Sequence, residues 1–124
     1  MDWGMRHKLL VVDDDPALVE ILTIFLREEY EIFSAENASS AMNIVQEQPL
    51  AALITDSLPA FRGLQVVRAF RKKNPAGAVI FFTGMAFDDI SQQAMSAGAS
   101  VVLFKPVGLN EVVAALRRLL AKSA

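Results

Sequence analysis

Short apolar runs alternate with segments of helical periodicity along the chain. Five of these runs are predicted as β-strands, and most of them lack polar residues at alternate positions: 9–12, 30–35, 50–55, 78–83 and 101–104. Strands without such alternation are buried on both faces, which is typical of a parallel sheet that helices cover on either side.

The segments between the runs carry the helix signals. Asp15-Pro16 supplies a cap and a first-turn proline, and five apolar residues after it share one helix face: Leu18, Ile21, Leu22, Phe25 and Leu26. Four more helices are expected, from about residue 37, over 63–73, from about residue 88 and near 110–122. The strict alternation predicts an α/β fold: a central five-stranded parallel sheet with two helices on one face and three on the other.

Polar residues stand at the ends of four of the five predicted strands: Asp13-Asp14-Asp15, Thr55-Asp56, Thr83-Gly84 and Lys105-Pro106. In an open parallel sheet, ligands bind beyond the carboxyl ends of the strands. We therefore expect these side chains to converge at one edge of the sheet.

This set of side chains fits phosphoryl chemistry assisted by a metal. Clustered carboxylates raise one another's pKa unless a cation compensates, and oxygen-only ligands favour a hard ion such as Mg²⁺. An ionised aspartate can attack phosphorus. Lys105 and Thr83 offer an ammonium and a hydroxyl to the oxygens of a phosphoryl group.

Each of these residues also has a purely structural interpretation. The aspartates after the first strand can cap the next helix, Lys105 can be a solvated surface lysine, and Thr83 can be a strand residue that uses its β-branch. One aspartate is enough for a cap, however. The four strand ends together are more specific for a site than any single residue.

Composition limits the class of protein. The chain has 124 residues, enough for one domain, which we expect over residues 8–122 after a flexible tail at 1–7. It has no cysteine, and its net charge of −2 gives no field that would attract nucleic acid or anionic lipid. With no bilayer-length apolar run and no signal-peptide pattern, the protein is expected to be cytoplasmic and not bound to membranes.

The sequence resembles the receiver domain of two-component response regulators. The resemblance runs from about Lys8 to Leu120 and is carried by LLVVDDDPALVEIL, ALITDSLPAFRGLQVV, VIFFTG and AMSAGASVVLFKPV. It implies a flavodoxin-like (CheY-like) sheet in the order 2-1-3-4-5. It also implies a phosphorylation switch rather than an enzyme: such a domain catalyses only its own phosphorylation and dephosphorylation.

The resemblance assigns roles at the metal site. Asp13 and Asp14 match the acidic pair that binds Mg²⁺, with Asp14 as the direct ligand and Asp13 acting through water. Asp56 matches the phosphoacceptor, which is also a metal ligand. The backbone carbonyl near Leu58 would complete the metal shell.

Further roles follow on the phosphate side of the site. Thr83 matches the switch hydroxyl, and Lys105 matches the phosphate-binding lysine, whose bond to Pro106 is often cis in the family. Implied partners are a sensor histidine kinase or phosphotransfer protein. A homodimer through the face of helix four, strand five and helix five, with Val113 and Arg117 as contact residues, is also implied.

Two departures from the family pattern bear on function. Asp56 lies three steps before Pro59 where the family usually has four, and a gapless alignment would place Thr55 at the acceptor position. We favour Asp56, because the ending Ile-Thr-Asp is common in the family. The aromatic switch position is occupied by Val102, and Phe104 is expected on the same face of the strand.

Three other functions remain open. A pseudo-receiver would use the same fold as a constitutive binding module, and the short loop after Asp56 and Val102 both favour it. A small aspartate-nucleophile phosphatase is less favoured, because position 17 is Ala and there is no room for a cap domain. A flavin mononucleotide carrier is least favoured, since three aspartates after the first strand would repel its phosphate.

Overall fold

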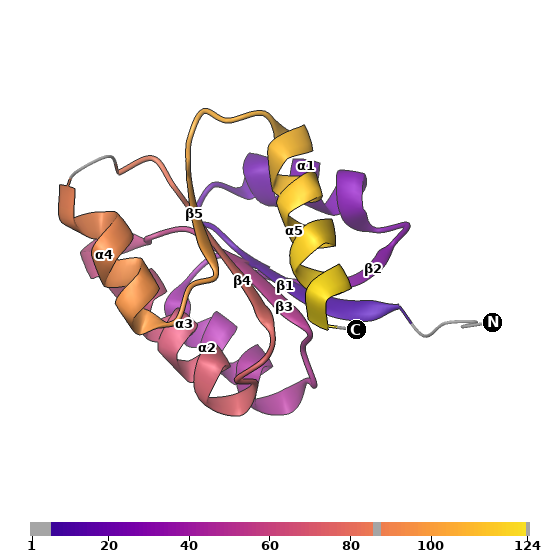
Figure 1. Ribbon diagram of the computed structural model, residues 1–124, viewed down its shortest axis with the longest axis horizontal. Helices are drawn as coiled ribbons and strands as arrows, with labels where there is room; N and C mark the ends of the chain where they lie inside the picture. Colours follow the sequence, from indigo (N-terminus) through magenta and orange to yellow (C-terminus); the bar gives the residue numbers. More distant parts are fainter. Residues whose placement is uncertain (1–5, 86–87, 124) are drawn as a thin grey trace.

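Five parallel strands form one sheet in the computed structural model, which describes residues 6–85 and 88–123. The strand order is β2-β1-β3-β4-β5, as the sequence predicts (Figure 1). The strands are β1 His7–Val12, β2 Tyr30–Ala35, β3 Ala52–Thr55, β4 Ala78–Thr83 and β5 Val101–Phe104. Each strand is joined to the next in the chain by a helix, which parallel pairing requires.

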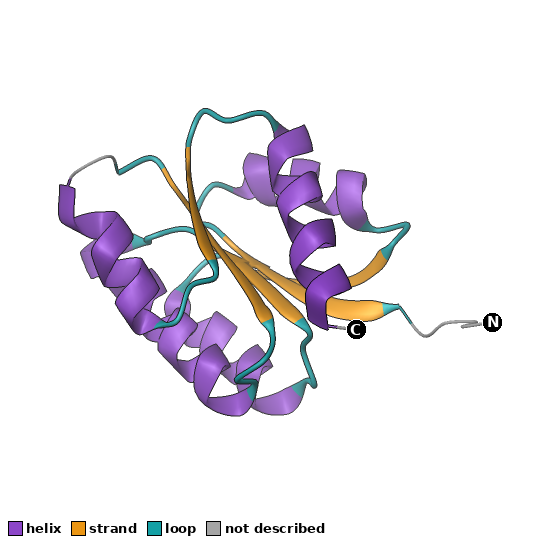
Figure 2. Cartoon of the chain, in the orientation of Figure 1, coloured by secondary structure: helices purple, strands orange, loops and turns teal. Residues whose placement is uncertain are grey.

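The helices cover both faces of the sheet, two on one side and three on the other, which confirms the predicted layers (Figure 2). They are α1 Pro16–Leu26, α2 Ala38–Glu47, α3 Arg62–Lys73, α4 Asp88–Ala97 and α5 Leu109–Ser123. One hydrophobic core lies between the sheet and α1 with α5, and the other lies between the sheet and α2, α3 and α4. None of the helices in the described part of the chain is both long and apolar enough to cross a membrane.

The central strands explain why the sequence shows no polar alternation. Leu10 and Val12 of β1 pack into the core under α2, whereas Leu9 and Val11 pack into the core under α1, and all four are at most 1% exposed. Successive strand residues point to opposite faces. Both sets must therefore be apolar when helices cover both faces.

Side-chain caps place two helices next to the carboxyl edge of the sheet. Asp15 accepts a hydrogen bond from the Ala17 amide at 3.1 Å and begins α1, as predicted. Asn37 accepts from the Ser40 amide at 2.8 Å and begins α2. Each cap satisfies an amide that has no partner inside its helix.

The connection from β3 to α3 has an unusual backbone that the sequence did not predict. A short 3-10 helix, η1 Pro59–Phe61, precedes α3, and three non-glycine residues have a positive φ: Leu58 (φ 63°), Ala60 (φ 57°) and Phe61 (φ 58°). Non-glycine residues adopt such backbone conformations at a cost of roughly 1–3 kcal/mol each. This connection therefore stores backbone strain directly beside Asp56.

A glycine allows the start of α3 to approach this connection closely. The Gly63 amide donates to the Ser57 carbonyl at 2.7 Å, and a Cβ on Gly63 would lie 2.0 Å from the Asp56 carbonyl oxygen. No side chain fits there, so Gly63 holds α3 against the backbone of Asp56 and Ser57. The flexible tail expected over residues 1–7 falls largely on residues 1–5, which lie outside the described residues.

Candidate functional site

Three aspartates meet at the carboxyl edge of the sheet. Asp13 and Asp14 follow β1, Asp56 follows the neighbouring strand β3, and each offers an oxygen within 4.8 Å of the others. The backbone fixes this arrangement, because the Asp56 amide donates to the Val12 carbonyl at 2.9 Å and so continues the ladder between the strands. Asp13 is buried, Asp56 is partly buried and Asp14 is exposed.

Lys105 reaches this group from the end of β5. Its Nζ lies 2.7 Å from Asp13 Oδ2 and 3.2 Å from Asp56 Oδ1, so one ammonium bridges two carboxylates. The bond from Lys105 to Pro106 is cis, as the resemblance implies. Burial alone would lower the pKa of Lys105, but its hydrogen bond to Asp13 and the charges of Asp56 and Asp13 raise that pKa above its usual value.

The two inner carboxylates are oriented by backbone amides as well as by the lysine. Asp13 Oδ1 accepts from the Asp15 amide at 2.9 Å, and Asp56 Oδ2 accepts from the Leu58 amide at 2.9 Å. Burial raises the pKa of Asp13, and the nearby charge of Asp56 adds to that rise, against the hydrogen bonds from Lys105 and Asp15. Three carboxylates face a single ammonium here, so the site has an excess of negative charge.

The structure brings Asp56 rather than Thr55 to this cluster. Thr55 is the last residue of β3 and is fully buried, and its hydroxyl donates to the Asp56 carbonyl oxygen at 3.0 Å. Asp56 instead directs its carboxylate to Lys105. The neighbouring residues thus have different environments, as expected for side chains that leave a strand on opposite faces.

Thr83 lies at the end of β4 and is fully buried, but its hydroxyl is hydrogen-bonded away from the aspartates. It donates to the Ser57 hydroxyl at 3.2 Å and accepts from the Met85 amide at 3.0 Å. Ser57 was not singled out from the sequence. A signal was present, because a serine directly after Asp56 is a polar residue at the end of an apolar strand.

The carbonyl oxygen of Leu58, expected to complete a metal shell, accepts a hydrogen bond from the Phe61 amide at 3.2 Å. That bond closes the turn of η1. A carbonyl oxygen has two lone pairs, so this contact occupies only part of its capacity, and the ligand role of Leu58 stays a prediction.

The donor set around the aspartates fits Mg²⁺. The side-chain atoms of this trio that could bind a metal are carboxylate oxygens, and they come close enough together to share one ion. One ammonium does not balance three carboxylates, so a divalent cation would complete the neutralisation. Asp13, Asp14 and Asp56 are the residues that would hold it.

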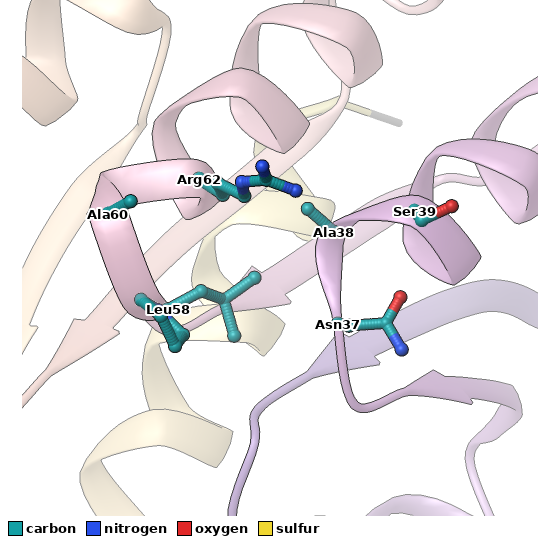
Figure 3. Close-up of a pocket in the computed structure, with 7 residues that line it drawn as sticks. Asn37, Ala38, Ser39, Leu58, Ala60 and Arg62 are labelled. Carbon is teal, nitrogen blue, oxygen red and sulfur yellow. The ribbon is translucent and has the colours of Figure 1, made fainter.

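An open pocket of about 410 Å³ lies between the start of α2 and the connection from β3 to α3 (Figure 3). Arg62 extends across it toward Ala38 at the start of α2, and its lining consists of Asn37, Ala38, Ser39, Leu58, Pro59, Ala60 and Arg62. None of the three aspartates lines it. Leu58 connects the two, since its amide holds Asp56 while it lines the pocket.

The surface expected around α5 needs a correction. Val113 is only 9% exposed and belongs to the core under α1 and α5, so it is not a contact residue. Arg117 is exposed, but it pairs with Glu29, which precedes β2, and so lies toward α1 rather than α4. The helical period explains the error, because the apolar stripe that Val113 shares is the buried face of α5.

The strand β5 agrees with expectation. Val102 and Phe104 both pack against the core under α2, α3 and α4, so they lie on the same face of the sheet. Phe104 therefore supplies an aromatic ring on the face where Val102 stands. Both side chains are only partly buried, as befits the edge strand.

Comparison with known proteins points to one family. The model of the family described as the response regulator receiver domain matches residues 9–117. The response regulator protein PilR of Pseudomonas aeruginosa is 36% identical over 119 residues, which cover 92% of this chain and 27% of PilR. This chain likewise spans only about half of two further curated relatives, 52% and 53% of their lengths.

Solved structures agree with the sequence relatives. A CheY-like response regulator receiver domain protein from Methanospirillum hungatei superimposes with a TM-score of 0.89 at 25% identity, covering 95% of this chain and 96% of that one. The response regulator protein TrrA from Thermotoga maritima, solved in complex with Mg²⁺ and beryllium fluoride, has a TM-score of 0.78 at 30% identity, covering 91% and 98%.

Proposed function

The chain belongs to the response regulator receiver domain family, and on that premise we propose that it is a switch phosphorylated on Asp56. The phosphoryl group would come from a histidine kinase or a phosphotransfer protein in the cytoplasm. The modified domain would then change its partner contacts. Receiver domains as a family are phosphoacceptor switches that bind Mg²⁺ at an acidic pocket.

One observation carries the proposal. The Asp56 carboxylate is held between Lys105 Nζ at 3.2 Å and the Leu58 amide at 2.9 Å, beside Asp13 and Asp14. These contacts orient the Asp56 carboxylate beside a cation, as a nucleophile toward phosphorus needs. The chain has the residues to which the family resemblance assigns roles in this reaction.

The transfer step uses the side chains as follows. A carboxylate oxygen of Asp56 forms the new P–O bond, the donor's bond to phosphorus breaks, and the donor atom keeps the electron pair. The Lys105 ammonium, already within reach, attracts the charge on the phosphoryl oxygens. Mg²⁺, when held by Asp13, Asp14 and Asp56, supplies further neutralisation of that charge.

The switch follows from the added charge. A phosphoryl group adds about −1.5 to −2 charge, next to Lys105 and near the end of β4, where Thr83 lies. Movement of Thr83 and Lys105 toward it would alter the face made of α4, β5 and α5. Phe104, which shares a face of β5 with Val102, is the aromatic residue placed to respond.

The pseudo-receiver is the second candidate, and one observation favours it. The connection after Asp56 contains three non-glycine residues with a positive φ, and the Leu58 carbonyl is hydrogen-bonded within the turn. Because the connection is constrained in this way, the Leu58 carbonyl oxygen is less accessible to a metal ion. In that case the domain would bind its partners without phosphorylation.

Incubation with acetyl phosphate and Mg²⁺, followed by intact-mass spectrometry, separates these functions. We expect the mass of one phosphoryl group on the wild type and on Thr55→Val, and none on Asp56→Ala. A wild type that stays unmodified, under conditions that label another receiver domain in the same tube, would establish the pseudo-receiver instead. Labelling of Asp56→Ala would show that the acceptor lies elsewhere.

A further inference from the structure

The Thr83 hydroxyl both donates and accepts a hydrogen bond in the structure. It has one proton, which it donates to Ser57 Oγ at 3.2 Å, and its oxygen accepts from the Met85 amide at 3.0 Å. Both side chains are buried, Thr83 completely and Ser57 to 3% exposure. Water therefore offers no ready substitute for this hydrogen bond.

Ser57 is itself held in place by its backbone. Its carbonyl accepts from the Gly63 amide at 2.7 Å at the start of α3. The residues on either side of Ser57 are bonded to each other, because the Asp56 carboxylate accepts a hydrogen bond from the Leu58 amide. Ser57 is thus fixed between the proposed phosphoacceptor and the loop that follows, with its hydroxyl aimed at the end of β4.

We infer that Ser57 is a positioning residue that holds the Thr83 hydroxyl away from the phosphoryl group in the resting domain. The inference rests on the proposed function, in which Thr83 donates to a phosphoryl oxygen. Thr83 cannot donate its one proton to both acceptors. Activation therefore breaks the bond to Ser57, and that bond biases the switch toward its resting state.

The size of the bias follows from ordinary hydrogen-bond energies. A buried hydrogen bond between neutral groups changes an equilibrium by about three- to tenfold. Ser57→Ala removes the resting acceptor and leaves the buried Thr83 donor unpaired until a phosphoryl oxygen arrives. The variant should therefore bind a phosphoryl mimic more tightly than the wild type.

Titration of the intact chain with beryllofluoride at constant Mg²⁺ tests this, with the Met85 amide NMR signal as the readout because that amide donates to Thr83. Ser57→Ala should lower the half-saturating concentration about three- to tenfold. Ser57→Thr, which keeps the hydroxyl, and Ser40→Ala, an exposed control on α2, should match the wild type. Affinity for Mg²⁺ alone should be equal in all of them.

A Thr83→Ala background separates positioning from general packing. There Ser57→Ala should have no effect on beryllofluoride affinity, because no hydroxyl remains to be held. An unchanged or weaker affinity in Ser57→Ala, or an equal gain without Thr83, would overturn the inference. A wild type that binds no beryllofluoride would instead refute the proposed function, and the inference about Ser57 with it.

Discussion

A partly buried cationic side chain lies at each end of the sheet, but the two cations have opposite kinds of partner. At the carboxyl end, the Lys105 ammonium meets carboxylates, and three of them share one cation. At the amino end, the Arg71 guanidinium meets neutral acceptors, with the carbonyls of Asn74, Pro75, Gly77 and Gly98 at 2.7–3.2 Å. Burial lowers the pKa of Arg71, and no carboxylate in the described part of the chain offsets that shift.

The two cations therefore differ in role: Arg71 contributes to the stability of the fold, and Lys105 belongs to the candidate functional site. Arg71 joins the end of α3 to the loops before β4 and β5. Its hydrogen bonds stabilise the packing of these segments, and a ligand would add little to that stability. The carboxyl end keeps an excess of negative charge, which costs stability until a cation arrives. Changes at the amino end should therefore alter folding alone, and changes at the carboxyl end should alter ligand binding first.

The largest expected effect is at Arg71. Arg71→Ala leaves several carbonyls without a donor and should lower the free energy of unfolding by about 3 kcal/mol, measured by urea denaturation. Arg71→Lys keeps the charge but not the planar set of donors, so it should recover only part of that loss. Mg²⁺ affinity should not change in either variant. A loss in Arg71→Ala below about 1 kcal/mol would mean that water replaces the guanidinium.

Gly98 should come next, because it serves the same cluster. Its φ of +121° is unfavourable for any side chain, and a Cβ would lie 2.9 Å from Arg71 Cγ. Gly98→Ala should cost about 2 kcal/mol in urea denaturation. Gly108→Ala is the matched control, since a Cβ there has no neighbour within 4 Å, and it should change stability little. Equal effects at both glycines would show that the close packing around Arg71 does not matter.

The fold could be predicted from the sequence because its signals are local. Each element has its own signal: apolar runs of strand length indicate strands, and the Asp15 and Asn37 caps and the apolar helical stripes indicate helices. The alternation of strands and helices along the chain then restricts the topology. The convergence of Asp13, Asp14, Asp56 and Lys105 was predictable for the same reason, since parallel strands bring their carboxyl ends together.

What the sequence could not predict depends on packing between distant segments. The hydrogen bond from Thr83 to Ser57 needs the register of β3 and β4, and the left-handed residues of η1 arise because a short connection must reach α3. The hydrogen bonds of Arg71 depend likewise on a distant loop, since the Gly98 carbonyl that it contacts lies 27 residues further along the chain. Val113 is a different case, because it shares the apolar stripe of α5 and the helical period alone therefore predicts its burial.

At the carboxyl end, Asp14→Asn removes one charged ligand from the proposed metal site. We expect Mg²⁺ affinity to fall at least about tenfold, by titration calorimetry, while metal-free stability rises by about 0.5 kcal/mol through relief of repulsion. Asp15→Asn is the control: it lies outside the acidic trio, and asparagine caps helices as well as aspartate does. Equal Mg²⁺ affinity in Asp14→Asn and wild type would show that the metal site is assigned wrongly.

The smallest effect is expected in the strained connection beside Asp56. Ala60 has a left-handed backbone (φ 57°), which glycine adopts freely, so Ala60→Gly should relieve strain. Part of that gain is offset by the greater freedom of glycine in the unfolded chain, so we expect a net stabilisation of about 0.5 kcal/mol in urea denaturation. Ala60→Val should be destabilising, because a β-branched residue fits this region poorly. If Ala60→Gly instead lowers stability as much as an ordinary alanine-to-glycine change, then this connection stores no strain, and the carboxyl end differs from the amino end only in its excess of charge.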